Sequence, residues 1–345
     1  MDNVRIGIIG AGQNTRRRHI PGFQAIDGVE IGCVANRTQE SARRVADEFG
    51  IPRVHEHWHD VVADPEIDAV CIGTWPYLHA PATCAALATG KHVLCEARMA
   101  TNATEARRMQ AAAQQSGRIA MLVPSPFGLV GDRVMRELLA SGFVGAVREI
   151  CVRALSAGMV DAAAPLQWRQ RADLSGVNTL TLGIVNETVQ RWFGRTESVV
   201  AQASCFVPRR VDPASGLLQD VDIPDSIAVL ARMTGGAQCV YHVSGHAHHG
   251  GPTQIEIYGA AGSVIYDLES DAIRGAPAGE PDLKPIDIPA DKAGGWQVES
   301  DFIAAVRGQR SITFTSFSDG VKYMCFTEAV RRAADSGRRV WLSEV

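Results

Sequence analysis

The 345-residue sequence lacks the features that mark several classes of protein. It has no apolar run near the roughly 18 residues of a transmembrane helix, and its opening residues lack the basic segment and long apolar stretch of a signal peptide. Its eight cysteines are scattered without the close pairing of a zinc or redox motif. We therefore expect a cytoplasmic protein with free thiols, no disulfide framework and no metal.

A strong excess of charge of either sign is also lacking, because 34 Lys and Arg residues face 38 Asp and Glu residues. Surfaces that bind nucleic acid or anionic membranes are strongly basic, so we expect neither partner. What is present is ordinary for a soluble globular protein, with 46% hydrophobic and 21% charged residues. The length predicts two domains, since domains commonly hold about 100–200 residues.

Strand and helix patterns alternate in the first third of the chain. Short continuous apolar runs predict parallel strands buried on both faces, and the stretches between them predict helices that cover the sheet. The expected strands are Val4–Ile9, Val29–Ala35, Ala69–Gly73, His92–Cys95 and Ile119–Val123. The first expected helix ends near Ile26, and the others span Gln39–Phe49, Ala80–Ala88 and Thr104–Gln115. The sequence therefore predicts an α/β Rossmann domain with a doubly wound parallel sheet over residues 1–125.

The pattern changes after about residue 145, where strand-like segments follow one another without helices between them. Gly, Asp and Pro turns separate these segments, which favours antiparallel pairing. The expected strands are Ala146–Arg153, Val199–Phe206, Ile227–Met233, Ala237–Ser244, Thr253–Tyr258 and Gly262–Asp267, with an edge strand within 274–291, and the expected helices are Leu180–Trp192, Gln297–Arg307 and Asp319–Asp335. We predict an α+β substrate and oligomerisation domain over residues 126–345, with a large open, mainly antiparallel sheet and last helices that can pack back on the Rossmann domain.

A glycine-rich turn, Gly10-Ala11-Gly12, follows the first predicted strand and opens a helix. The first glycine permits the tight turn, the second lets the backbone approach a pyrophosphate, and the helix N-terminus offers free N–H groups. We assign Gln13, Asn14 and Thr15 to the same site, although Thr15 stands where a third small residue is usual. Because a strand precedes the turn and a helix follows it, dinucleotide binding is favoured over a plain structural turn.

The end of the second predicted strand bears on the choice between NAD and NADP. An acidic residue there would bind the ribose hydroxyl and repel a 2′-phosphate. The chain has Asn36 and Arg37 instead, and Arg37 can pair with a phosphate. The sequence therefore favours NADP over NAD, the alternative being that Arg37 is a solvated loop residue.

Several motifs together resemble the Gfo/Idh/MocA family of oxidoreductases. They are Gly7-Ile-Ile-Gly-Ala-Gly12, His19, Ile67-Asp-Ala-Val70, Leu78-His79, Gly90-Lys-His-Val93, Ile257-Tyr-Gly-Ala-Ala-Gly-Ser263 and the Asp301-Phe302 helix. The resemblance covers nearly the whole chain and implies an NAD(P)-binding oxidoreductase that forms a homodimer or homotetramer through its C-terminal sheet. It also implies that the cofactor lies at the loops of Thr74, Trp75, Pro76, His79 and Glu96.

The chain departs from that family where proton transfer is usual. Family members carry Glu-Lys-Pro after the fifth strand, whereas this chain has Glu96-Ala97-Arg98. They also carry Asp-x-Gly-x-His-x-x-Asp on the helix that faces the nicotinamide; anchoring on Gly183 places Thr181, Val185 and Thr188 at those three positions. Alcohol oxidation leaves a proton that a group of suitable pKa must take. The departures therefore imply a non-standard mechanism.

Four residues are candidates to replace the missing groups: Arg98, Asn186, His246 and His248. The pKa of Arg98 is too high for a base, but Arg98 can stabilise charge or clamp a substrate carboxylate, the alternative being a surface ion pair. A local change of helix register would turn Asn186 inward. His246 and His248 share strand parity with His242 and would point the same way on an unbroken strand, the alternatives being a solvated sheet edge and a less favoured metal site. The segment 55–60, which is rich in His, is interpreted as structural.

The substrate contacts that we expect come from Arg98, Trp168, Arg169, Asn178, Thr181 and Val185, with a buried structural role as the alternative for Trp168. These observations favour an NAD(P)-dependent oxidoreductase of non-standard mechanism that acts on a small polar or acidic substrate. Two other functions stay open. One is an enzyme that uses the nicotinamide transiently or without net redox, such as a lyase, hydrolase or decarboxylase. The other is a non-catalytic nucleotide-binding protein.

Overall fold

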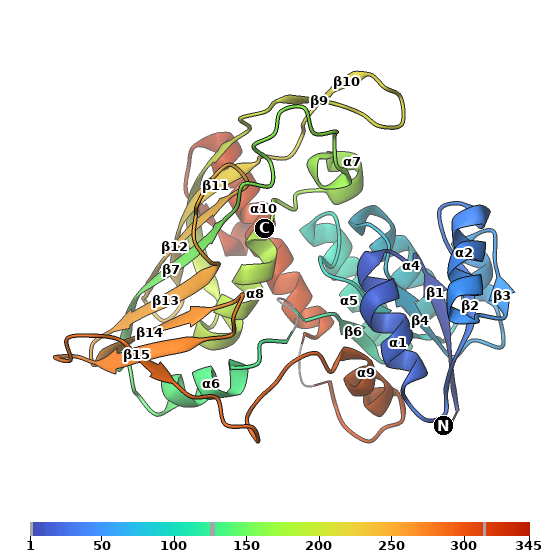
Figure 1. The fold of residues 1–345 in the computed structure, drawn as a ribbon, viewed down its shortest axis with the longest axis horizontal. Helices are drawn as coiled ribbons and strands as arrows, with labels where there is room; N and C mark the ends of the chain where they lie inside the picture. The colour runs from blue at the N-terminus through green and yellow to red at the C-terminus, as the bar shows by residue number, and fades with distance from the viewer. Residues whose placement is uncertain (1–2, 125–127, 313–314) are drawn as a thin grey trace. The chain divides into compact units, whose positions relative to one another are not determined.

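A computed structural model describes residues 3–124, 128–312 and 315–345 of the chain. They form two compact units (Figure 1): the first contains residues up to 124 together with 297–321, and the second contains residues 125–296 and 322–345. Among the described residues, no helix combines the length and apolar character needed to cross a membrane. Each unit is built on one large sheet.

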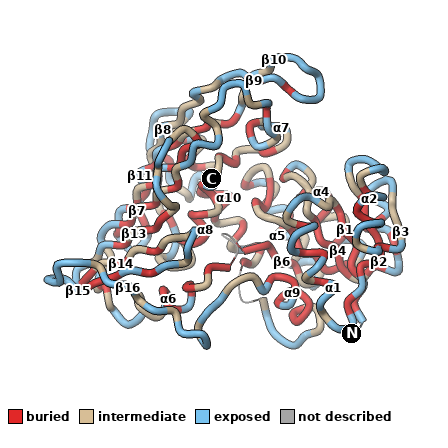
Figure 2. Tube along the Cα trace, in the orientation of Figure 1, coloured by how far each residue is buried: buried red, intermediate tan, exposed pale blue. Residues whose placement is uncertain are grey.

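The sheet of the first unit has six parallel strands in the order β3-β2-β1-β4-β5-β6. They are β1 (Val4–Ile9), β2 (Val29–Ala35), β3 (Arg53–Val54), β4 (Ala69–Ile72), β5 (His92–Cys95) and β6 (Ala120–Leu122). The central strands are buried almost throughout (Figure 2), which is why their sequences are continuous apolar runs. The predicted doubly wound parallel sheet is confirmed. Its strand order reverses between β1 and β4, the kind of place where dinucleotides bind.

Helices lie between these strands in the sequence, and one helix comes from later in the chain. The helices between the strands are η1 (Thr15–His19), α1 (Ile20–Gln24), α2 (Gln39–Phe49), α3 (Trp58–Ala63), α4 (Pro76–Ala88) and α5 (Ala103–Ser116), and the later helix is α9 (Val298–Val306). Local chemistry fixes the ends of α2, because the Thr38 hydroxyl accepts the Ser41 N–H at 3.2 Å and Gly50 ends the helix with a φ of 67°. Helix α9 packs against α1, so a segment near residue 300 completes the first unit.

The large sheet of the second unit has nine strands in the order β16-β15-β14-β13-β7-β12-β11-β8-β17. They are β7 (Val147–Leu155), β8 (Thr196–Ser204), β11 (Ser226–Met233), β12 (Gln238–Ser244), β13 (Gln254–Gly259), β14 (Gly262–Asp267), β15 (Ile273–Pro277), β16 (Lys284–Ile286) and β17 (Val340–Trp341). Neighbours are antiparallel except β7 and β12, which run parallel. The predicted mainly antiparallel sheet is confirmed. Strand β11 alternates: Val229 is buried in the core, whereas Leu230 is 57% exposed.

The remaining elements of the second unit surround this sheet. The helices are α6 (Asp132–Ala140), α7 (Ala172–Ser175), α8 (Leu182–Phe193) and the part of α10 (Phe317–Ser336) from Lys322 onward, with short turns η2 (Trp168–Gln170) and η3 (Leu342–Glu344). A hairpin of β9 (Arg209–Val211) and β10 (Leu218–Asp220) forms its own small sheet. Helix α6 is absent from the sequence prediction, although Val134, Met135, Leu138 and Leu139 have helical spacing.

Candidate functional site

The glycine-rich turn between β1 and η1 lies against the carboxyl end of β4. Gly10 has a φ of 84°, and a Cβ built there would lie 2.5 Å from Thr74 Cγ2. Thr15 is 1% exposed and donates its hydroxyl to the Gly10 carbonyl at 3.2 Å, so it fits where a third small residue is usual. Gly12 and Gln13 are exposed. The turn is thus held tightly from behind and accessible in front, as a pyrophosphate cradle requires.

Two residues at the end of β2 flank this turn. Asn36 Oδ1 accepts the N–H of Ala11 at 2.7 Å, so the side chain fixes the turn itself. Arg37 is exposed, and its guanidinium carbon lies 5.4 Å from the centre of the Trp75 ring. An exposed cation beside an aromatic face suits the adenosine end of a dinucleotide.

Buried His79 connects the loops that follow β4 and β5. Its Nδ1 lies 2.8 Å from the Arg98 carbonyl oxygen, and its Nε2 lies 3.0 Å from the Thr74 carbonyl oxygen. Burial lowers the pKa of His79, although both carbonyls favour the protonated ring. Trp75 is the N-cap of α4, and Pro76 is its first residue. Arg98 is only 6% exposed, so its interpretation as a surface ion pair is wrong.

His19 forms a buried cluster with Glu96 and Glu299, which we call the His19 cluster. Its Nδ1 lies 2.5 Å from Glu299 Oε1, and its Nε2 lies 3.0 Å from Glu96 Oε1. Asn14 donates to the same Glu96 oxygen, and the Ala97 N–H donates to Glu96 Oε2 at 3.1 Å. Burial opposes charge on His19, but hydrogen bonds to both carboxylates outweigh it and raise the pKa of His19 to about 9. Burial also opposes ionisation of Glu96, yet the hydrogen bond from His19 helps to lower its pKa.

Helix α8 turns its central residues into the core of the second unit. Val185 is 1% exposed and lies in that core. Asn186 is fully buried, donates to the Tyr241 hydroxyl at 2.9 Å and accepts from Gln190. Asn186 therefore lies in the core of the second unit on a regular helix, and no change of helix register is needed to bury it. Thr181, at the N-cap, is exposed.

The histidine segment does not form one strand face. Strand β12 ends at Ser244, so the unbroken strand on which His242, His246 and His248 would share one side is not formed. His246 instead lies with its Nε2 2.8 Å from Asp225 Oδ2. Asp225 is 1% exposed and also accepts two backbone N–H groups, those of residues 206 and 207. Sequence reasoning missed Asp225, although it directly precedes β11, the strand that pairs with β12.

Comparison of the chain with known proteins shows which family it belongs to. A model of an oxidoreductase family with an NAD-binding Rossmann fold matches residues 4–123, and a model of the GFO/IDH/MocA C-terminal domain matches residues 133–265. The chain belongs to the Gfo/Idh/MocA family. A 1,5-anhydro-D-fructose reductase of Ensifer adhaerens is 27% identical over 341 residues, which are 97% of each chain.

Two further relatives of this Gfo/Idh/MocA protein differ in how much they share with it. An uncharacterized oxidoreductase of Rhizobium meliloti is 35% identical over 154 residues, which are 44% of this chain and 45% of that protein. The structure of a levoglucosan dehydrogenase in complex with NADH and L-sorbose has the same fold, with a TM-score of 0.85, 22% identity and coverage of 99% of each chain.

The predicted substrate residues of this family member have local partners. Arg169 is exposed, and its guanidinium carbon lies 4.2 Å from the centre of the half-buried Trp168 ring. Asn178 is 2% exposed and donates its amide to the Ser175 carbonyl at 2.6 Å. The Asn178 contact shapes the loop between α7 and α8, and a substrate role for these residues stays a prediction.

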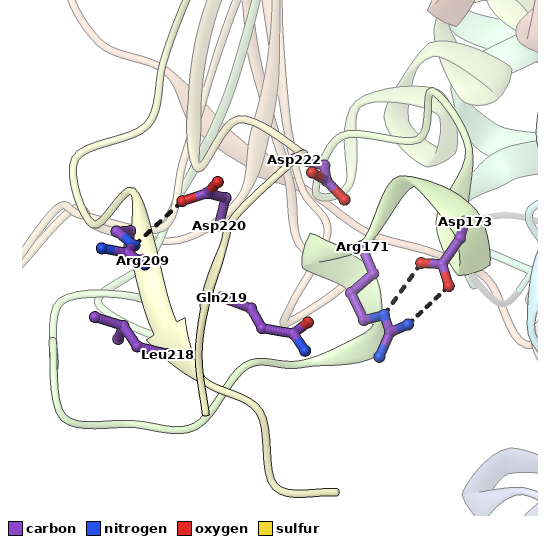
Figure 3. Close-up of a pocket in the computed structure, with 7 residues that line it drawn as sticks. All are labelled: Arg171, Asp173, Arg209, Leu218, Gln219, Asp220 and Asp222. Atoms are coloured by element: carbon purple, nitrogen blue, oxygen red, sulfur yellow. Dashed lines mark hydrogen bonds and ion pairs between the residues drawn. The ribbon is translucent and has the colours of Figure 1, made fainter. Parts of the chain in front are cut away.

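A polar pocket of about 440 Å³ lies between the β9–β10 hairpin and α7 (Figure 3). It is lined by Arg171, Asp173, Arg209, Leu218, Gln219, Asp220 and Asp222. Arg171 pairs with Asp173 at 2.8 Å, and Arg209 pairs with Asp220 at 3.2 Å. The predicted substrate residues are not in this lining, and its two cations already have carboxylate partners.

Another group of polar side chains lies beside β2 in the first unit. Ligand atoms of Cys33, His55 and Asp64 lie within 4.8 Å of one another. Arg53 Nη1, however, is 2.7 Å from Asp64 Oδ2, and Lys91 Nζ donates to the Asp64 carbonyl at 2.6 Å. Burial raises the pKa of the Cys33 thiol to about 12, which favours the neutral thiol. With Arg53 at the Asp64 carboxylate and Lys91 at the Asp64 carbonyl, this cluster has the character of a structural polar network.

Proposed function

We propose that the chain is an NAD(P)-dependent oxidoreductase of non-standard mechanism that favours NADP and acts on a small polar or acidic substrate of the sugar class. The packing of Gly10 against Thr74, with Gly12 and Gln13 accessible in front, is the observation that carries the proposal. The dinucleotide, when bound, would supply or accept the hydride. The sugar class is supported by the activity named for the Ensifer relative and by the L-sorbose bound to the dehydrogenase of like fold.

The preference for NADP rests on the two residues after β2. The oxygen of Asn36 is already taken by the Ala11 N–H, so this position presents an amide donor and no carboxylate that would repel a phosphate. Arg37 is exposed beside Trp75, where a guanidinium can make two hydrogen bonds to a 2′-phosphate.

We assign proton transfer to His246, because the positions usual in the family hold Ala97 and Val185. Asp225 orients the His246 ring, and a carboxylate-oriented imidazole is a common arrangement for a general base. Exposed His248 is the second candidate for this role. Buried Arg98 keeps its charge at any working pH, so we assign it the binding of a negatively charged or strongly polar substrate group.

We also infer that copies of the chain associate through the large sheet of the second unit. Apolar or aromatic side chains of its strands remain exposed, with Leu230 57% and Tyr258 37% exposed. Replacing Leu230 with Glu should shift the molecular mass measured by light scattering towards that of one chain. An unchanged mass would remove this strand from the interface.

Titration of the purified protein with NADPH and NADH, followed by fluorescence quenching, tests the cofactor assignment. We expect both to bind and NADPH to bind about tenfold more tightly. Tighter binding of NADH would overturn the NADP preference, and failure of both to bind would overturn the oxidoreductase. Turnover is then followed by nicotinamide absorbance on ketoses, anhydro sugars and sugar acids. A nicotinamide that co-purifies and does not exchange would instead support transient redox.

A further inference from the structure

Arg210 is a buried cation of the second unit to which the proposed function gives no role. We propose that Arg210 is a positioning residue for His246, and that the contacts of the ring make Nδ1 of His246 the nitrogen that takes the substrate proton. Arg210 acts through residues 156–164, which we call the bridging segment. The inference rests on the proposed function, because it requires His246 to be the general base.

Arg210 binds the bridging segment at three points. It lies on β9 between two exposed neighbours and is itself only 2% exposed. Its Nη1 donates to the carbonyls of Asp161 at 2.6 Å and Ala164 at 2.9 Å, and its Nη2 donates to the carbonyl of Met159 at 2.6 Å. The bridging segment lies between β7 and η2, outside regular structure, so its carbonyls need such partners. Because the guanidinium is planar and rigid, these bonds fix the bridging segment relative to β9.

The bridging segment also holds the backbone on both sides of His246. The Met159 N–H donates to the Gly245 carbonyl at 2.9 Å, and the Ala247 N–H donates to the Ser156 carbonyl at 2.8 Å. A Cβ built on Gly245 would lie 2.4 Å from Met159 Cγ, so the two segments pack closely there. Met159 is therefore the link between them: the guanidinium binds its carbonyl, and its N–H binds the residue that precedes the histidine.

The ring of His246 uses one of its two nitrogens for a structural contact. Nε2 lies 2.8 Å from Asp225 Oδ2, and a carboxylate at that distance keeps the proton of the neutral ring on Nε2. Within the described part of the chain Nδ1 has no hydrogen-bond partner, so its lone pair is the basic site. Because Nδ1 is closer to Cα along the side chain than Nε2 is, its position follows the backbone closely. The backbone that Arg210 holds therefore sets where the proton acceptor lies.

Oxidation of a substrate alcohol releases a hydride and a proton. The hydride goes to the oxidised dinucleotide, the hydroxyl proton goes to Nδ1 of His246, and the carbon–oxygen bond becomes a carbonyl. The Asp225 carboxylate stabilises the imidazolium that forms. Since a displacement of about 1 Å at a reacting group can cost roughly 100-fold in rate, the contacts of Arg210 should influence kcat rather than cofactor binding.

Steady-state kinetics of Arg210→Met test the positioning role. Methionine is long and apolar and has no donors, so kcat should fall about tenfold while the dissociation constant of the dinucleotide stays unchanged. Arg210→Lys keeps a charged donor and should recover part of the loss. Arg209→Met, at an exposed site on the same strand, is the matched control and should leave kcat unchanged. Gly245→Ala disturbs the contact with Met159 from the other side and should also lower kcat, which serves if Arg210→Met does not fold.

The tautomer of His246 can be measured without substrate or cofactor. In ¹⁵N-histidine NMR at a pH at which the ring is neutral, the signal of His246 is the one that disappears in His246→Ala. In the wild-type protein it should show a proton on Nε2 and none on Nδ1. Arg210→Met should show a mixture of both tautomers, because the ring is no longer held against Asp225. A wild-type ring protonated on Nδ1 would overturn the inference.

The outcomes separate the inference from the proposed function. An unchanged kcat in Arg210→Met would overturn the inference while the proposed function stands. A fall in kcat without any change in the His246 tautomer would show a merely structural role and would also overturn the inference. A wild-type protein that oxidises none of the sugars would overturn the proposed function, and the tautomer measurement would still decide whether Arg210 positions the His246 ring.

Discussion

The two units differ in what their candidate sites are made of. In the first unit the key features belong to the backbone: the turn at Gly10, the start of a helix and the ends of parallel strands. In the second unit the candidates are side chains, Asn186 and His246, whose roles depend on Tyr241 and Asp225 from other segments. A site built from backbone geometry can be predicted from a short sequence motif. A site built from paired side chains cannot, because the pairing depends on strand register.

The sharpest test of a backbone-built site is Gly10→Ala. A Cβ there meets Thr74 at 2.5 Å, and φ is 84°, so we expect cofactor binding to fall below detection in fluorescence titration. Gly50→Ala is the matched control, because its φ is 67° but no atom lies within 4 Å of the added Cβ. That control should lose about 1 kcal/mol of stability and keep its cofactor affinity. If both variants bind the cofactor with normal affinity, close packing at Gly10 is not required for cofactor binding.

The pH dependence of stability tests the His19 cluster in the absence of ligand. The folded-state pKa of about 9 lies above the ordinary value of 6.5, so His19 stabilises the fold fully below pH 6.5 and loses this contribution as pH rises through about 9. The loss should amount to about 3 kcal/mol in the free energy of unfolding measured with urea. His19→Gln should show a flatter profile over that range. Parallel profiles for the two proteins would contradict the raised pKa.

The side-chain site of the second unit is tested with His246→Ala. Loss of a general base should lower kcat about 100-fold without a matching change in cofactor affinity. Asp225→Asn, which leaves the ring in place without its carboxylate, should reproduce much of that loss and move the pH profile of kcat. His248→Ala is the control on the same segment. A larger effect of His248→Ala would transfer the role to His248.

The smallest expected effect concerns Arg37. Arg37→Ala should weaken the binding of NADPH about tenfold and leave the binding of NADH nearly unchanged, because only NADPH carries the 2′-phosphate. Arg44→Ala, at another exposed cation of the same unit, should change neither affinity. Equal weakening of both cofactors would assign Arg37 to the adenine or the pyrophosphate.

Local sequence predicts the first unit well because its elements end at local signals. Thr38 and Gly50 bound α2 at the predicted residues, and the five predicted strands of the parallel sheet lie within one or two residues of the predictions, whereas no range was predicted for the two-residue strand β3. The contact of His19 with Glu299 could not be predicted, since 280 residues separate them and no motif links them. The family resemblance contains His19 but says nothing of its partner.

In the second unit, one element could have been predicted from the sequence and was not, and one contact could not have been predicted. Helix α6 had its signal in the spacing of Val134, Met135, Leu138 and Leu139. The pairing of His246 with Asp225 follows from the register of β11 and β12, in which Ser226 lies opposite Ser244. Sequence parity could not supply the end of β12 at Ser244, because parity orders side chains along an unbroken strand and does not show where that strand ends.

The origin of Glu299 in α9 has a consequence for the order of synthesis. The six strands of the first unit are complete by Leu122, but the partner of His19 Nδ1 emerges from the ribosome only after the strands β7 to β16. A nascent chain that stops short of α9 therefore lacks the Glu299 carboxylate that contacts His19 in the complete chain. The first unit therefore gains this carboxylate only after most of the second unit has been synthesised. Completion of the first unit thus depends on synthesis of nearly the whole chain.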